Sequence, residues 1–133
     1  MKKRILILSA FALITFGLSG QTMKQYVKSA NEAFEKQDYY SALYFLSLIQ
    51  EIDSTRIDLQ FKQAEAARHF NAYQLAEKRY QQVLESENTK QFPMAIFWKA
   101  TVQKMQGKYD EAIAGFQQYK LYYILRSNVH SFY

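Results

Sequence analysis

The sequence of 133 residues contains no cysteine, one proline and four glycines. Without cysteine, the chain can form no disulfide bond and offers neither a thiolate nucleophile nor a cysteine-based metal site. Because helix-breaking residues are so few, a chain rich in Ala, Gln, Lys, Glu, Leu and Tyr is expected to be mostly helical. Hydrophobic residues make up 49% of the sequence, which is enough for a core. We therefore predict one all-α domain.

The sequence also lacks a strong excess of one charge over the region expected to fold. Of the 17 Lys and Arg residues, three are Lys2, Lys3 and Arg4, and the other 14 compare with 12 Asp and Glu. Nucleic-acid binding requires a clustered basic face, which this scattered pattern does not provide. We therefore expect no nucleic-acid partner.

Recognisable catalytic motifs are absent as well. The sequence has no glycine-rich phosphate loop, no His-Glu-x-x-His and no Gly-x-Ser-x-Gly. Its two histidines, His69 and His130, lie far apart in the chain. We predict that the protein is not an enzyme and uses no cofactor and no metal. An enzyme would need a deep pocket in which groups such as His69, Glu65 and Arg68 converge.

The first 20 residues have the pattern of a secretory signal peptide. A basic Lys-Lys-Arg segment precedes an uncharged apolar run over residues 5–16, and the small residues Gly17, Ser19 and Gly20 follow. The run is shorter than the ~20 residues of a membrane-spanning helix. We predict cleavage after Gly20, the alternative being an uncleaved membrane anchor. No cysteine follows, so the protein is not a lipoprotein, and we expect it in the periplasm or associated with the outer membrane.

Residues 21–133 contain a repeat of about 34 residues, over 23–56, 57–90 and 93–126. Each repeat carries a Tyr-x-x-Ala anchor, and another alanine precedes each anchor alanine by twelve residues. The anchors are Tyr39 and Ala42, Tyr73 and Ala76, and Tyr109 and Ala112, and the preceding alanines are Ala30, Ala64 and Ala100. Apolar residues recur at steps of three and four, as on one face of a helix. We interpret each repeat as a helical hairpin whose alanines mark the helix crossing.

The expected turns contain residues suited to the end of a helix. Gln37, Asn71 and Gly107 occupy equivalent turn positions, and glycine or asparagine tolerates a positive φ there. Pro93 falls where the first helix of the third repeat should start, a place where its missing N–H costs nothing. These positions support three hairpins of two helices each.

The pattern resembles the tetratricopeptide repeat (TPR) family over about residues 23–120, most clearly in the third repeat, Gly107-Lys108-Tyr109-Asp110-Glu111-Ala112-Ile113 with Phe116. The resemblance implies a right-handed superhelix of about three hairpins. Together with the signal peptide, it is similar to the N-terminal repeat region of OmpA-family envelope proteins, some of which serve type IX secretion. This chain stops before the propeller and OmpA-like domains of those proteins, so peptidoglycan binding is not carried over.

In TPR proteins the first helix of each hairpin lines a concave groove that binds a partner. The resemblance places in this groove Val27, Asn31, Phe34, Phe61, Glu65, Arg68, Phe97, Thr101 and Lys104, with Glu35, His69 and Met105 beside them. Arg68 and Lys104 would hold an acidic segment or a carboxylate. The alternative is that Phe34 and Phe61 pack between hairpins and Arg68 pairs with Glu65 or Glu35. We expect Trp98 in the core rather than in the groove.

The main functional hypothesis is an exported protein-interaction scaffold of the bacterial envelope, which binds a protein or peptide through this groove. The alternative is a structural fragment or subunit of a larger outer-membrane or secretion assembly, with self-association through the aromatic C-terminal residues. An exposed apolar patch including Tyr122, Tyr123 and Phe132 would favour this alternative. Residues 121–125 either continue the last helix, or they form an exposed apolar end, as expected if this chain is a truncated relative of a larger protein.

Overall fold

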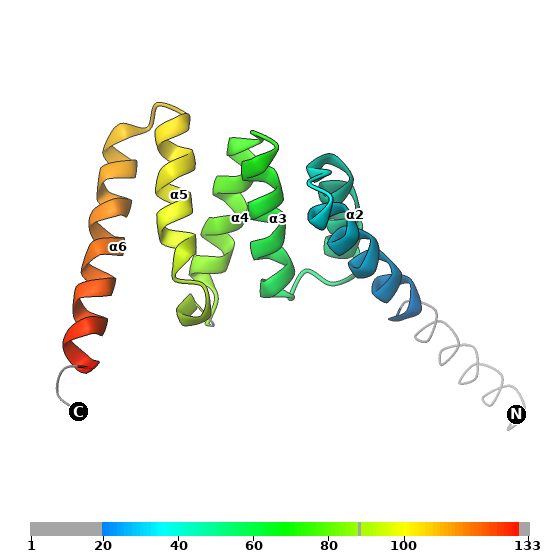
Figure 1. The fold of residues 1–133 in the computed structure, drawn as a ribbon, viewed down its shortest axis with the longest axis horizontal. Coiled ribbons are helices and arrows are strands. Elements are labelled where there is room, and N and C mark those ends of the chain that lie inside the picture. The colour runs from blue at the N-terminus through cyan, green and yellow to red at the C-terminus, as the bar shows by residue number, and fades with distance from the viewer. Residues whose placement is uncertain (1–19, 88, 131–133) are drawn as a thin grey trace, which may run out of the picture. The chain divides into compact units, whose positions relative to one another are not determined.

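The computed structural model describes residues 20–87 and 89–130, and within these ranges it contains helices, turns and connections but no strand (Figure 1). The chain divides into two compact units, Met1–Ser54 and Thr55–Tyr133. Apart from Gly20, the signal peptide predicted from the sequence lies outside the described residues. None of the described helices is both long enough and apolar enough to span a membrane.

The first unit contains a helix over residues 20–35 and helix α2 (Tyr39–Ile52), which form one hairpin. Its buried core consists of Ala30, Ala33, Ala42, Leu46 and Ile49. These positions repeat at three- and four-residue steps, so each helix has one apolar stripe. At the start of α2, the Asp38 carboxylate accepts a hydrogen bond from the Ser41 N–H at 3.1 Å and caps the helix.

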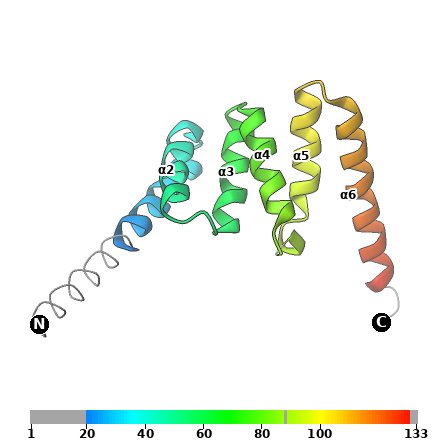
Figure 2. The same cartoon turned by 180° about the vertical axis from the view of Figure 1, so that it is seen from behind.

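The second unit contains two further hairpins. Helices α3 (Ile57–His69) and α4 (Tyr73–Glu85) form the first, and α5 (Met94–Met105) and α6 (Tyr109–His130) form the second, with a short 3₁₀ helix η1 (Thr89–Gln91) between them. Each helix packs on the next one in the chain (Figure 1 and Figure 2). Helix α5 begins directly after Pro93, as predicted, and the φ of Pro93 is −61°.

All three hairpin turns are built in the same way. Gln37, Asn71 and Gly107 have positive φ angles of 59°, 63° and 77°. The N–H of the residue after each bonds a carbonyl five residues back, as from Ala72 to Ala67 at 2.8 Å. This pattern satisfies carbonyls that the helix end leaves without partners. The predicted turn positions are therefore confirmed, including Gln37, whose side chain does not favour this conformation.

The repeat alanines are buried in all three hairpins, and the predicted close approach of two helices is shown at Ala100. Ala30, Ala64 and Ala100 are 0% exposed, as are the anchor alanines Ala42 and Ala76, and Ala112 is 2% exposed. Helices α5 and α6 lie close together at Gly115, where an added Cβ would lie 2.8 Å from the Cβ of Ala100. Small side chains at these positions allow the hairpin helices to pack tightly.

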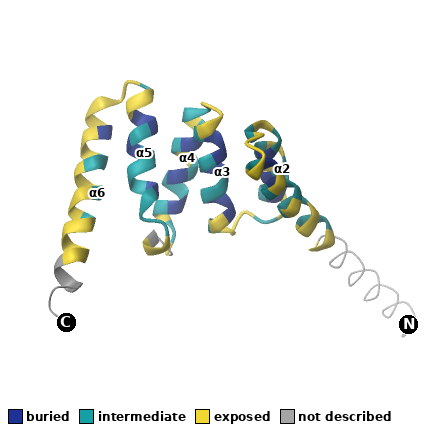
Figure 3. Ribbon diagram, in the orientation of Figure 1, coloured by how far each residue is buried: buried dark blue, intermediate teal, exposed yellow. Residues whose placement is uncertain are grey.

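Helix α6 is 22 residues long, whereas the equivalent α4 has 13. It runs through residues 121–125, which confirms that these residues continue the last helix. Figure 3 shows buried positions on α3, α4 and α5, and mostly exposed positions along α6. The exposed large apolar side chains of α6 are Tyr109, Ile113, Leu121, Tyr123, Ile124 and Leu125.

Candidate functional site

The first helices of the second unit, α3 and α5, carry six of the residues predicted to line the groove. Phe61, Glu65 and Arg68 lie on α3, and Phe97, Thr101 and Lys104 lie on α5. In each helix the three residues are spaced by three or four positions and so share one side. We call this surface, together with Trp98 and Met105 of α5, the first-helix face.

Arg68 is the centre of a hydrogen-bonded network on this face. Its Nη2 bonds the Glu65 carboxylate at 2.8 Å, and its Nε bonds the Tyr80 hydroxyl at 3.2 Å. The Tyr80 hydroxyl also donates to the other oxygen of Glu65. The side chains of Arg68 and Glu65 are 16% and 18% exposed. Arg68 therefore forms the ion pair with Glu65 that the sequence left as the alternative to partner binding.

The guanidinium of Arg68 also connects the two hairpins of the second unit. It lies 3.8 Å from the centre of the Trp98 ring, within the range of a cation–π contact. Trp98 is half-buried and lies at the first-helix face, where it contacts α3 through this guanidinium. The flat surface formed by Arg68 and Trp98 is consequently held by contacts from both α3 and α4.

The pKa shifts of this network favour the charged form of Arg68 and the neutral form of Tyr80. Burial lowers the pKa of Arg68, but the hydrogen bonds and charge of Glu65 and Tyr80 outweigh burial and raise it overall. Burial and the hydrogen bond to Glu65 raise the pKa of the Tyr80 hydroxyl, so this group stays protonated. Burial and the neighbouring Arg68 cation lower the pKa of His69. The network thus holds one cation and one anion together near neutral pH.

The two phenylalanines of the first-helix face mainly pack inside the second unit. The Phe61 ring stacks on Phe92, with centroids 5.0 Å apart, and also contacts Tyr80. The Phe97 ring contacts Phe116 at 5.4 Å and Tyr119 at 5.2 Å on α6. Both are half-buried, so each presents part of one ring to solvent.

The polar end of this face is formed by residues of α5. The Thr101 hydroxyl donates to the backbone carbonyl of Phe97 at 2.9 Å, and Lys104 is exposed. Met105, next to Lys104, is 54% exposed. Lys104 and Met105 are therefore the side chains of this face that are most accessible to a partner.

The remaining predicted groove residues belong to the first unit. Val27, Asn31 and Phe34 are half-buried, and Glu35 is exposed. The Phe34 ring meets Tyr39 edge to face, with centroids 5.5 Å apart. Phe34 thus contacts the start of α2 within its own hairpin.

His69 lies beside Arg68, with its Nε2 3.1 Å from Nη2. His69, Glu65 and Arg68 therefore lie close together on α3, but His69 is exposed rather than in a deep pocket, and the Glu65 carboxylate already accepts bonds from Arg68 and Tyr80. The residues that the structure describes contain no group of three or more His, Asp or Glu side chains that could hold a metal ion.

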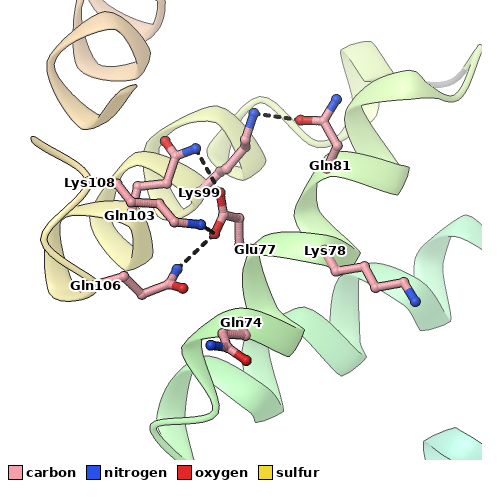
Figure 4. Close-up of a pocket in the computed structure, with 8 residues that line it drawn as sticks. All are labelled: Gln74, Glu77, Lys78, Gln81, Lys99, Gln103, Gln106 and Lys108. Atoms are coloured by element: carbon pink, nitrogen blue, oxygen red, sulfur yellow. Dashed lines mark hydrogen bonds and ion pairs between the residues drawn. The ribbon is translucent and has the colours of Figure 1, made fainter. Parts of the chain in front are cut away.

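The sequence reasoning missed a polar cleft of about 430 Å³ between α4 and α5 (Figure 4). Glu77 of α4 accepts hydrogen bonds in it from Gln103, Gln106 and Lys108. Burial opposes ionisation of Glu77, but these three bonds outweigh burial and lower its pKa. The feature of the sequence that could have indicated this cleft is the series of polar residues along α4 at helical spacing. The cleft is lined by Gln74, Glu77, Lys78, Gln81, Lys99, Gln103, Gln106 and Lys108.

Comparison with known proteins identifies the fold. No family model and no curated protein matches the chain. Three solved structures are similar over 76–77% of this chain, at 16–22% identity. They are the TPR domain of Arabidopsis OM64 (TM-score 0.66, 84% of that chain), the second TPR domain of human RPAP3 with the HSP70 peptide SGPTIEEVD (0.67, 84%), and the second TPR of Spaghetti (RPAP3) with the HSP90 peptide SRMEEVD (0.64, 94%). The chain has the all-helical hairpin fold of TPR domains.

Proposed function

We propose that this protein is a non-enzymatic interaction module that binds a segment of a partner protein at the first-helix face. The observation that carries the proposal is the Arg68–Trp98 surface, which Glu65 and Tyr80 hold in place before any partner arrives. A rigid aromatic surface with a polar rim suits protein recognition, because little conformational entropy is lost on binding. The two similar RPAP3 structures each hold a peptide, which supports the same kind of role.

The charges of the first-helix face restrict the partner. Both peptides in the RPAP3 structures end in Glu-Glu-Val-Asp, which is acidic. In this chain the charge of Arg68 is balanced by Glu65, which leaves Lys104 as the exposed cation of the face. We therefore expect the partner segment to offer an apolar or aromatic side chain to Trp98 and one acidic group to Lys104.

Export to the bacterial envelope is the second part of the proposal. It rests on the basic, apolar and small-residue segments of residues 1–20. When the chain is produced in a Gram-negative host, we expect the envelope fraction to contain the processed protein. Its intact mass, measured by mass spectrometry, should equal that of a chain beginning at Gln21. The matched control is Leu8→Arg, which breaks the apolar run and should leave an unprocessed chain in the cytosol. An unprocessed wild-type chain in the cytosol would contradict export, and one in the membrane would indicate an anchor.

A role as a subunit of a larger assembly is the second candidate, and the exposed side chains of α6 favour it. Leu121, Ile124 and Leu125 are exposed at three- and four-residue spacing, so they share one side of α6, and an exposed apolar patch commonly marks an interface. Tyr122, which was expected in this patch, is half-buried, and Phe132 lies outside the described residues. In this role α6 would pack against a permanently bound neighbouring subunit. That subunit is either a different protein or a second copy of this chain.

Site-specific photo-cross-linking separates the two candidates. A photoreactive amino acid is placed at Met105 on the first-helix face, at Leu125 on α6, or at the exposed Glu87 as a control. We expect a discrete protein adduct from Met105, lost when Lys104→Glu is added, and none from Glu87. Circular dichroism verifies that the Lys104→Glu chain is folded. Adducts from Leu125 alone would overturn the first-helix proposal in favour of the assembly role, and equal adducts from all three positions would contradict both.

A further inference from the structure

The polar cleft between α4 and α5 lies where the repeat would otherwise place apolar side chains. Glu77 is equivalent to Leu43 in the first repeat and to Ile113 in the third, and Lys78 is equivalent to Tyr44 and Ala114. In a stack of helical repeats, each hairpin normally buries apolar surface against its neighbour. A local departure from this rule is expected at functional sites.

The interactions inside the cleft leave the carboxylate of Glu77 fully occupied. It accepts from Gln103 at 3.0 Å, from Gln106 at 2.8 Å and from Lys108 at 2.7 Å. These bonds use the NH₂ groups of both glutamines, so their amide oxygens remain as acceptors that can bind a peptide N–H. The negative charge of Glu77 is neutralised by Lys108.

Lys99 is a half-buried cation of the cleft with no opposite charge beside it, whereas Lys78 is exposed. The Nζ of Lys99 donates to the amide oxygen of Gln81, which is neutral. Gln81 in turn donates to Glu85 at 2.7 Å. Among the described residues, no carboxylate lies within ion-pair distance of Lys99. A partly buried ammonium without a counter-ion favours binding of an anion from outside.

We propose that this cleft is a second binding site, which takes a carboxylate side chain on an extended segment of a partner protein. Lys99 would bind the carboxylate, and the amides of Gln103 and Gln106 would bind the backbone beside it. Figure 4 shows Lys99 and Gln81 on one side of Glu77, and Lys78 directed away from Glu77. A carboxylate on a peptide fits better than free phosphate, because the peptide backbone beside it offers N–H groups to the amide oxygens of Gln103 and Gln106, which phosphate does not.

This site is independent of the first-helix face. At 100° per residue, Gln103 of α5 projects to the side of the helix away from Thr101. A partner could therefore use both surfaces, and either proposal could fail without the other.

Nuclear magnetic resonance of the ¹⁵N-labelled chain tests the proposal, because the glutamine side-chain amides give their own signals. The probes are a terminally blocked serine–glycine peptide with two adjacent glutamates, the same peptide with two glutamines, and inorganic phosphate. We expect the acidic peptide to shift the signals of Gln81, Gln103 and Gln106, and the glutamine peptide to leave them unchanged. Lys99→Gln should weaken binding by about tenfold, whereas Lys99→Arg and the control Lys120→Gln, at an exposed position of α6 outside the cleft, should each stay within about threefold.

Four outcomes would overturn the proposal. They are no shift at millimolar peptide, equal shifts with the glutamine peptide, tighter binding of phosphate than of the acidic peptide, and equal weakening by Lys120→Gln. The three probe comparisons use the unsubstituted chain, so they decide the matter even if Lys99→Gln does not fold. Failure here would leave the cross-link at Met105 unaffected, because Met105 does not line the cleft.

Discussion

Replacing Tyr80 with alanine is expected to lower the free energy of unfolding of the second unit by roughly 3–5 kcal/mol. Tyr80 is 0% exposed and is the largest fully buried side chain among the described residues. Its removal leaves a cavity beside Phe61 and takes away the hydroxyl that joins Glu65 to Arg68. Urea unfolding followed by the fluorescence of Trp98, the single tryptophan, measures the change.

Two further variants separate the ring from the hydroxyl. Tyr80→Phe keeps the ring and leaves bonds of Glu65 and Arg68 unmade, so it should cost about 1–3 kcal/mol. Tyr109→Ala is the control, because it removes the same type of side chain from the next hairpin at a position that is 64% exposed. It should lower the free energy of unfolding by about 0.5 kcal/mol or less. Equal losses for Tyr80→Ala and Tyr109→Ala would show that Tyr80 does not pack as described.

Replacing Gly115 with leucine is the second substitution with a large expected effect, a loss of about 1–3 kcal/mol or more. A Cβ at this position would lie 2.8 Å from the Cβ of Ala100 and 3.5 Å from its Cα, so α5 and α6 would have to separate. Ala114→Leu is the matched control, because Ala114 is exposed and adjacent on the same helix. Thermal unfolding by circular dichroism compares the two.

A reciprocal exchange makes this prediction specific. Gly115→Ala combined with Ala100→Gly places the single methyl group on α6 instead of α5 and should be more stable than Gly115→Leu, despite the unfavourable glycine in α5. If Gly115→Leu unfolds at the same temperature as Ala114→Leu, the close approach of the two helices is wrong.

The sequence by itself determined the hairpins, because it contains their local causes. Turn residues Asn71 and Gly107 accept the positive φ that ends a helix, and Pro93 supplies the φ of a helix start. The alanines at fixed spacing predicted closely packed positions in each hairpin, and all six are buried. These features depend on short stretches of chain, so a pattern of residues is sufficient to predict them.

The roles of the groove residues could be predicted only in part. Helical spacing placed Arg68 and Glu65 near each other, so their pairing could be foreseen as an alternative. Tyr80 is 12 residues from Arg68 in the chain and Trp98 is 30, and no local pattern indicates that both contact the same guanidinium. The sequence therefore left open whether Arg68 serves a partner or the fold.

Only the tertiary structure revealed the cleft between α4 and α5. From the sequence alone, the polar residues along one side of α4 predict an ordinary solvent-exposed helix face. Its meaning depends on Gln103, Gln106 and Lys108, which lie 26 to 31 residues further along the chain and meet Glu77 only when α5 packs on α4. Local residue patterns determined the helices and their turns, whereas the partners of each buried or half-buried charge were decided by packing between segments distant in sequence.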